Sequence, residues 1–214
     1  RGVAEPVTDS LVAIGIQAMP ALLDGLTGSS QCRSGTVYVL SRLDQDGVIK
    51  ALQSTGLNSK DARKKEATLE ALVLLGPRMK KILPALYETH QSKNVIYRIK
   101  AARAISAMTP KAREFLLQCA KHLRQTGKMD KAQFSAQLKA SSLDPRSVVA
   151  GLHVFLEGRK YKQESLILLR LLKVLAKPVI PSVLIQTLGP PRSIPYVQAL
   201  AQRTLVELDQ KAVM

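Results

Sequence analysis

Few residues of this 214-residue sequence have the types and spacing that catalysis or metal binding requires. Cys119 and His122 lie one turn apart on a predicted helix and could share a metal ion, but no second pair of ligands has suitable spacing. We therefore interpret them as a buried thiol beside a surface imidazole. The other histidines, His90 and His153, are scattered, and no Ser, His and Asp arrangement stands out, although sequence order alone does not exclude a triad.

One loop, at residues 25–30, is rich in glycine and serine. A phosphate-binding loop needs a lysine and a preceding strand, and this segment has neither. We interpret it as a helix-capping turn. The sequence therefore predicts no catalytic residue, no cofactor and no metal site, and we expect a protein that is not an enzyme.

The composition favours helices as the elements that position any site. Hydrophobic residues make up 46% of the sequence, enough for a sizeable core, whereas aromatic residues make up only 4% and Trp is absent. Abundant Leu and Ala favour helices over strands, so an all-β fold is close to excluded. Cys32 and Cys119 are too few for a disulfide framework, and a single bridge between them stays open. Because the chain begins at Arg1, we expect a processed chain or a fragment of a longer one.

The most apolar stretch, residues 165–185, does not read as a membrane span, because charged residues and prolines interrupt it. Arg170, Lys173 and Lys177 give the same stretch a basic side that could lie on an anionic membrane surface. Packing within a helical fold would use its apolar face, so a membrane is not expected as a partner. The sequence leaves the compartment unassigned, with the cytoplasm favoured.

A helical pattern recurs at residues 11–26, 71–86 and 172–188. In each copy one helix ends at a small residue, a short turn follows, and a second helix carries a proline before its main apolar run, namely Pro20, Pro84 or Pro181. Proline is tolerated near a helix start because the first turn has no internal acceptor for its N–H. Thr109 and Asp144, each followed by proline, predict helix N-caps. Helix ends are predicted at four glycines, Gly56, Gly76, Gly127 and Gly158.

An arginine opens several predicted helices and lies on their apolar stripe, because small or apolar residues follow it at about i+4 and i+7 or i+8. The arginines of this series are Arg33, Arg63, Arg98, Arg146 and Arg192. We expect them to form a structural ladder inside the fold, each pairing with a carboxylate or with helix-end carbonyls of the neighbouring repeat.

This combination of a Leu-rich helix with an internal proline, a short turn and a second helix opening near an arginine resembles HEAT repeats. The likeness is clearest at residues 11–43, 71–108 and 172–206, and weaker over 110–165, where the lengths differ and the proline is missing. It implies an all-α fold, a right-handed α-solenoid of about six HEAT-like hairpins with a repeat of about 35 to 40 residues. We expect one domain over residues 1–214, with an irregular middle region at about 110–165.

Two enzyme classes with HEAT-like folds bear on the expectation that the protein is not an enzyme. The alkylpurine DNA glycosylases are similar in size and basic charge, but they rely on tryptophans and an aspartate in a concave cleft. This sequence has no Trp, so none of those residues has a matching position. The HEAT-like phycobilin lyases give no matching active-site residues either.

Positive charge is concentrated in the middle of the chain. The net charge is +16, and residues 60–131 carry 17 Lys or Arg against 6 Asp or Glu, a net charge of +11. Successive repeats stack side by side, so basic residues at equivalent helical positions are expected to form one stripe. The candidate anion- or partner-binding residues of this stripe are Lys60, Lys64, Lys65, Lys80, Lys81, Lys100 and Arg103.

The predicted function is therefore that of a binding protein. We expect a non-catalytic scaffold of the HEAT-repeat type whose basic surface holds an acidic protein or an acidic subunit of a complex. The alternative is a sequence-nonspecific nucleic-acid-binding protein that contacts the phosphates of DNA or RNA. The low aromatic content argues against base stacking on single strands. The sequence alone does not decide between these two partners.

Overall fold

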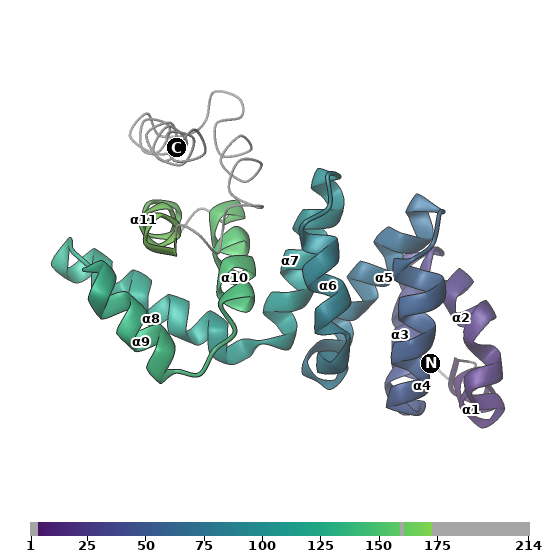
Figure 1. Cartoon of the computed structure of the whole chain (residues 1–214). Helices are drawn as coiled ribbons and strands as arrows, with labels where there is room; N and C mark the ends of the chain where they lie inside the picture. Colours follow the sequence, from purple (N-terminus) through teal and green to yellow (C-terminus); the bar gives the residue numbers. More distant parts are fainter. Residues whose placement is uncertain (1–3, 159–160, 173–214) are drawn as a thin grey trace.

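The computed structural model describes residues 4–158 and 161–172, and these residues form helices with no strand among them. The all-α prediction is confirmed. In Figure 1 the helices follow one another along the molecule, from α1 at one end to α8, α9 and α11 at the other. The α-helices in the described ranges are α1 (Ala4–Ile14), α2 (Met19–Leu26), α3 (Ser30–Arg42), α4 (Gln45–Ala51), α5 (Ala62–Leu75), α6 (Leu83–His90), α7 (Val95–Met108), α8 (Pro110–Thr126), α9 (Lys131–Ala140), α10 (Pro145–Glu157) and α11 (Lys162–Leu172).

Three shorter helical segments continue α-helices without a break. Two are 3₁₀ segments, η1 (Gly15–Ala18) and η3 (Gly76–Ile82), which lead into α2 and α6, and the third is the π-helical η2 (Leu52–Leu57) that follows α4. Pro20 and Pro84 lie within the first two residues of α2 and α6, as the sequence predicted. The third proline of the pattern, Pro181, lies outside the described residues.

Side-chain caps fix many of the helix starts. Six polar side chains accept hydrogen bonds from backbone N–H groups in the first turn that follows them, which satisfies donors that have no partner inside the helix. These caps are Ser29, Asp44, Asp61, Asn94, Asp130 and Asp144. Asp144 and Thr109 are the N-cap residues of α10 and α8, as predicted, but only the Asp144 side chain makes a capping hydrogen bond. The Thr109 hydroxyl instead donates to the carbonyl of Ile105 in the preceding helix, at 2.7 Å.

Glycines occupy the ends of several helices. Gly76, Gly127 and Gly158 follow α5, α8 and α10, as predicted. Gly127 has φ +68°, the left-handed conformation that glycine adopts without a steric penalty. Gly56 differs, because it lies inside η2, where a Cβ atom would approach Oγ1 of Thr68 to 2.6 Å. Its absent side chain lets η2 pack closely on α5.

The buried side chains form two hydrophobic clusters that meet at α10. The first extends from α2 to α7, and the second is built from α8 to α11. Ala150 of α10 belongs to the first cluster, while Val148 and Leu152 of the same helix belong to the second. α10 also packs directly against α7, although α8 and α9 lie between them in the sequence. The α8–α9 segment therefore interrupts the order in which helices close in sequence pack against one another, and we call it the α8–α9 excursion.

One stretch, Val7–Leu26, is long and apolar enough to cross a membrane when judged only by length and composition. Core helices and signal sequences meet the same criteria. The stretch is not one regular α-helix, because η1 interrupts it and Gly15 has φ +68°. Leu22, Leu23 and Leu26 from its second half are buried in the first hydrophobic cluster.

Candidate functional site

Ion pairs connect helices that are neighbours in space. The pairs reach from α1 to α3, from α2 to α5 and from α4 to η3, with N–O distances of 3.1, 2.6 and 2.7 Å. In the same order they are Asp9–Arg42, Asp24–Lys64 and Asp46–Lys81, whose members lie 33 to 40 positions apart in the sequence.

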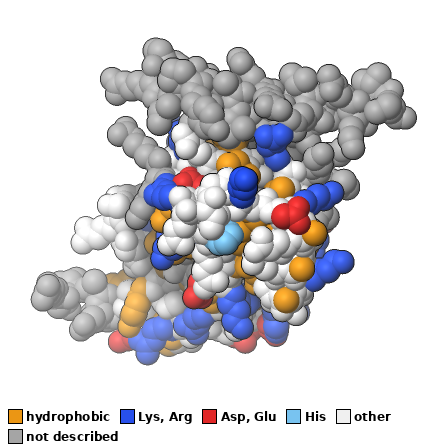
Figure 2. Space-filling view, turned by 90° about the vertical axis from the view of Figure 1, so that its left-hand side faces the viewer, with side chains coloured by type: hydrophobic (Ala, Val, Ile, Leu, Met, Phe, Trp, Pro, Cys, Tyr) orange, Lys and Arg blue, Asp and Glu red, His pale blue; other side chains and the backbone are white. Residues whose placement is uncertain are grey.

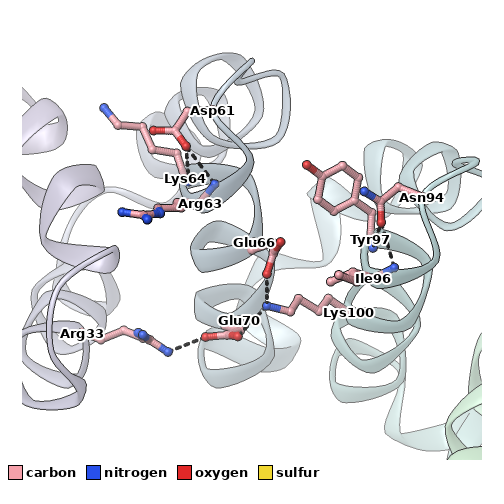
Figure 3. A network of polar contacts seen from close by, with 10 residues as sticks. All are labelled: Arg33, Asp61, Arg63, Lys64, Glu66, Glu70, Asn94, Ile96, Tyr97 and Lys100. Atoms are coloured by element: carbon pink, nitrogen blue, oxygen red, sulfur yellow. Dashed lines mark hydrogen bonds and ion pairs between the residues drawn. The ribbon is translucent and has the colours of Figure 1, made fainter.

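The most connected group of charges lies over α5 (Figure 3). Arg33 of α3 donates to Glu70 of α5, and Lys100 of α7 donates to the same carboxylate at 2.8 Å and to Glu66 at 2.7 Å. Glu70 thus holds cations from both neighbouring helices. The three helices are joined by charge on one side, and hydrophobic packing joins them on the other.

Helical periodicity places these carboxylates on the accessible side of α5. Ala67, Ala71 and Leu75, at intervals of four, are buried in the core. Glu66, Glu70 and Leu74 precede them by one position each, so they lie on a neighbouring strip of the helix surface. Leu74 ends this strip with 62% of its surface exposed.

The charges of this network stabilise one another. The hydrogen bond from Lys100, and the nearby charges of Lys100, Arg33 and Arg103, lower the pKa of Glu70 despite its partial burial. Burial opposes the charged form of Lys100, but its hydrogen bonds to Glu66 and Glu70 raise the pKa of that amine overall. Both shifts favour the ionised forms of Glu70 and Lys100 at neutral pH, so this ion pair is held together by charge as well as by hydrogen bonds.

A groove of about 320 Å³ lies beside this network. We call it the α5 groove, and its lining consists of Arg33, Glu70, Val73, Leu74, Lys100 and Arg103. Arg103 also donates to Glu157 of α10 at 3.0 Å, and its side chain is 55% exposed. The α5 groove therefore combines three cations and one carboxylate with an exposed aliphatic contact.

The residues of the predicted stripe do not form one uninterrupted row of unpaired cations. Lys64, Lys81, Lys100 and Arg103 each contact a carboxylate of a neighbouring helix. Only Lys100 and Arg103 of the stripe line the α5 groove. Lys100 is just 19% exposed at its side chain, so it belongs to the internal network as much as to the surface.

The other three stripe residues make no ion pair with a described carboxylate. Lys60 and Lys80 are exposed, in the turn before α5 and in η3. The ammonium of Lys65 lies 5.0 Å from the centre of the Tyr97 ring, a cation–π contact between α5 and α7.

The ladder arginines have different partners. Arg33 contacts a carboxylate of α5, and Arg98 is buried and donates to the carbonyls of Ser92 and Lys93 at 2.6 and 3.0 Å. Arg146 pairs with its own cap, Asp144, at 2.8 Å and lies over the Tyr87 ring. The Arg63 side chain is exposed at the start of α5, so its environment differs from that of Arg98. Arg192 lies outside the described residues.

Two histidines that are far apart in the sequence, His90 and His153, lie side by side in the core between α6 and α10. Nε2 of His90 lies 3.1 Å from Nδ1 of His153, and both side chains are buried. Closer to the start of each helix, the hydroxyls of Tyr87 and Ser147 share a hydrogen bond of 2.7 Å. The two histidines are 63 positions apart, with the α8–α9 excursion between them, so their contact could not be predicted from sequence spacing.

Burial lowers the pKa of His90 to about 3, and the nearby His153 and Arg98 act in the same direction. His90 is therefore neutral in the folded protein at physiological pH. The hydrogen bond between the two rings satisfies one nitrogen of each residue inside the core.

The cysteines are not bridged. Cys32 is exposed and Cys119 is buried, and burial raises the pKa of the Cys119 thiol to about 11. Within the described ranges, no three His, Cys, Asp or Glu side chains are grouped so that they could hold a metal ion.

In comparisons with known proteins, no family model, no curated protein and no solved structure matches this chain.

Proposed function

We propose that this chain is a non-catalytic binding scaffold of the HEAT-repeat type, a right-handed α-solenoid of about six hairpins. Helices stacked in succession and ion pairs between residues 33 to 40 positions apart support this architecture. That interval is close to the repeat length expected from the sequence. The α8–α9 excursion is the irregular part of the proposed solenoid.

We infer further that the α5 groove holds an acidic segment of a partner protein, one that also carries an aliphatic side chain. The observation that supports this most directly is the 62% exposure of Leu74 beside three cations and a single carboxylate. An aliphatic residue of the partner would cover Leu74 and Val73. Its carboxylates would approach Arg103, whose side chain keeps 55% of its surface exposed while it contacts Glu157.

The network around Glu70 suits this task because it orders the groove before a partner arrives. Arg33 and Lys100 are long side chains that would otherwise lose conformational freedom on binding. Their ion pairs with Glu70 already restrict that freedom in the free protein. These side chains therefore lose their conformational entropy on folding, so that a partner binding to them loses less entropy.

Binding to nucleic-acid phosphates is the second candidate. It is supported by exposed cations for which the described residues offer no carboxylate within ion-pair distance, among them Lys60, Lys80, Lys111 and Arg113. We rank it second because four of the seven stripe residues already contact carboxylates of this chain, which reduces the charge they offer to phosphates.

The test compares two double variants of exposed residues. Leu74→Ser with Arg103→Glu alters the α5 groove, and the matched control, Ile96→Ser with Lys93→Glu, makes the same changes at exposed positions outside its lining. Proteins bound to each immobilised variant would be quantified by mass spectrometry after nuclease treatment.

A partner of the α5 groove should be at least about fivefold depleted on the groove variant, because removing a central contact costs more than about 1 kcal/mol. The control variant should retain it. Equal capture by both variants would refute the groove as the binding site. Loss of every partner after nuclease treatment, together with steeply salt-dependent binding of a 20-base-pair duplex, would favour nucleic acid instead.

A further inference from the structure

A second cavity lies at the opposite end of the molecule from α1, where α9 stands beside α10 and α11. It has a volume of about 340 Å³. Most of its lining is apolar and comes from Phe134 and Leu138 of α9, Leu143 and Pro145 before and at the start of α10, and Leu171 and Leu172 of α11. We call this cavity the α9 pocket.

The pocket exists because α9 packs less closely than its neighbours. α10 makes extensive backbone contacts with α7, α8 and α11, whereas α9 has no comparable contact with another described helix. Phe134 still anchors α9 in the core, with its ring 5.8 Å from that of Phe115. Among the described residues, the space between α9 and the end of α11 is therefore left unfilled.

Cations and hydroxyls lie at the edge of this apolar space. Lys131 and Lys139 line it from the two ends of α9, and Ser135 and Ser142 line it between and beyond them. Both lysines are exposed, and no carboxylate is found among the described lining residues. Asp130, the residue before Lys131, is engaged as the cap of α9 and accepts hydrogen bonds from two backbone N–H groups.

The wider surface is also positive. Figure 2 looks onto this end of the molecule, where Lys and Arg side chains are spread among hydrophobic ones and along the lower edge. Between residues 110 and 140 the chain carries seven Lys or Arg and only two acidic residues, Glu114 and Asp130. An anion approaching the α9 pocket is therefore attracted before it makes contact.

We propose that the α9 pocket binds an anionic amphiphile with a single acyl chain, of the free fatty acid class. The acyl chain would lie against Phe134, Leu138 and Leu172, and the carboxylate would lie near Lys131 or Lys139. The volume suits a chain of about ten carbons, because cavities of this size bury one small ligand. It is too small for both chains of a phospholipid. This inference does not depend on the α5 groove, which lies on other helices.

The first experiment titrates the full chain with decanoate and follows binding by isothermal titration calorimetry. We expect saturable binding with one site. Octanoate should bind about tenfold more weakly, because it buries two fewer methylene groups. Decanol, which has the same chain without the charge, should bind at least threefold more weakly than decanoate at low salt.

Two variants locate the site. Lys131→Gln with Lys139→Gln should weaken decanoate binding about two- to fivefold, the size expected for one exposed ion pair to either lysine, and should leave decanol binding unchanged. Lys50→Gln with Lys93→Gln removes two exposed lysines elsewhere and should have no effect. Ser135→Trp places a large side chain on the partly exposed wall of the pocket and should abolish binding of both ligands.

Absence of saturable decanoate binding would overturn the proposal, as would unchanged binding by the Ser135→Trp variant when circular dichroism shows it folded. Equal affinity for decanol and decanoate would also overturn it, because the lysines would then have no role. If an acidic peptide containing leucine binds in a Ser135-dependent manner while decanoate does not, the pocket is a peptide site and the fatty-acid proposal fails.

Discussion

The buried His90–His153 pair makes stability depend on pH in a way that can be calculated. His90 is only 3% exposed, and its environment lowers its pKa from 6.5 to about 3. The unfolded chain takes up a proton at His90 as the pH falls through 6.5. The folded protein does not take up that proton until the pH nears 3. Acidification therefore favours the unfolded state over this range, and the stability contributed by neutral His90 is present above pH 6.5.

The size of the change in the free energy of unfolding follows from the lowered pKa of His90. Each pH unit below 6.5 costs about 1.4 kcal/mol, because the unfolded state binds one more proton than the folded state. Between pH 7 and pH 5 the free energy of unfolding should fall by about 2 kcal/mol from this residue alone. Most carboxylates stay ionised over this interval, since their ordinary pKa values lie near 4.

The assay is urea unfolding followed by circular dichroism at several pH values between 5 and 7, on the wild type and on His90→Gln. The variant replaces the imidazole with an amide that does not titrate, so its pH dependence should be smaller by about 2 kcal/mol over the interval. The His122→Gln variant removes an imidazole outside the pair and should keep the wild-type dependence. Equal pH dependence of wild type and His90→Gln would refute the inference that His90 is neutral because it is buried.

Three further outcomes test the fold and the cap assignments. Asp61→Ala should lower the free energy of unfolding by about 1 kcal/mol, because Asp61 caps two N–H groups of α5; no loss of stability would show that the cap has no energetic role. Leu72→Ala should cost about 3 kcal/mol, since Leu72 is fully buried in the first cluster; a cost under 1 kcal/mol in urea unfolding would contradict that burial. Cys32 should react with a thiol reagent in the native protein, whereas Cys119, buried and with a raised pKa, should react only after denaturation; mass spectrometry of the labelled peptides would reveal early modification of Cys119 if this is wrong.

Local chemistry made the helices predictable from the sequence. Asp144 with the following proline, and Gly127 at a helix end, act through the few residues around them, so their roles are visible without tertiary structure. Thr109 is likewise the N-cap of α8, but its hydroxyl does not cap that helix. Only one residue separates α7 from α8 there, and the Thr109 hydroxyl donates back to the carbonyl of Ile105 in α7.

The candidate site was less predictable because it depends on which residues meet across helices. Lys100 was assigned to a surface stripe and Arg33 to an internal ladder, yet both contact Glu70. An excess of cations is visible in the sequence, whereas nothing in the sequence marks Glu70 as the carboxylate that joins them. His90 and His153 were missed for a related reason, because their meeting depends on α10 packing against α7 across the α8–α9 excursion.

The short reach of the ion pairs between helices has a consequence for how the chain folds. These pairs join residues 30 to 54 positions apart, so forming them never requires distant ends of the chain to meet. Stacked helices can add to a folded neighbour one after another. During synthesis, α3, α5 and α7 can each pack as soon as they emerge. α10 is the exception, because it packs on α7 and the intervening residues 109–144 must be synthesised before it.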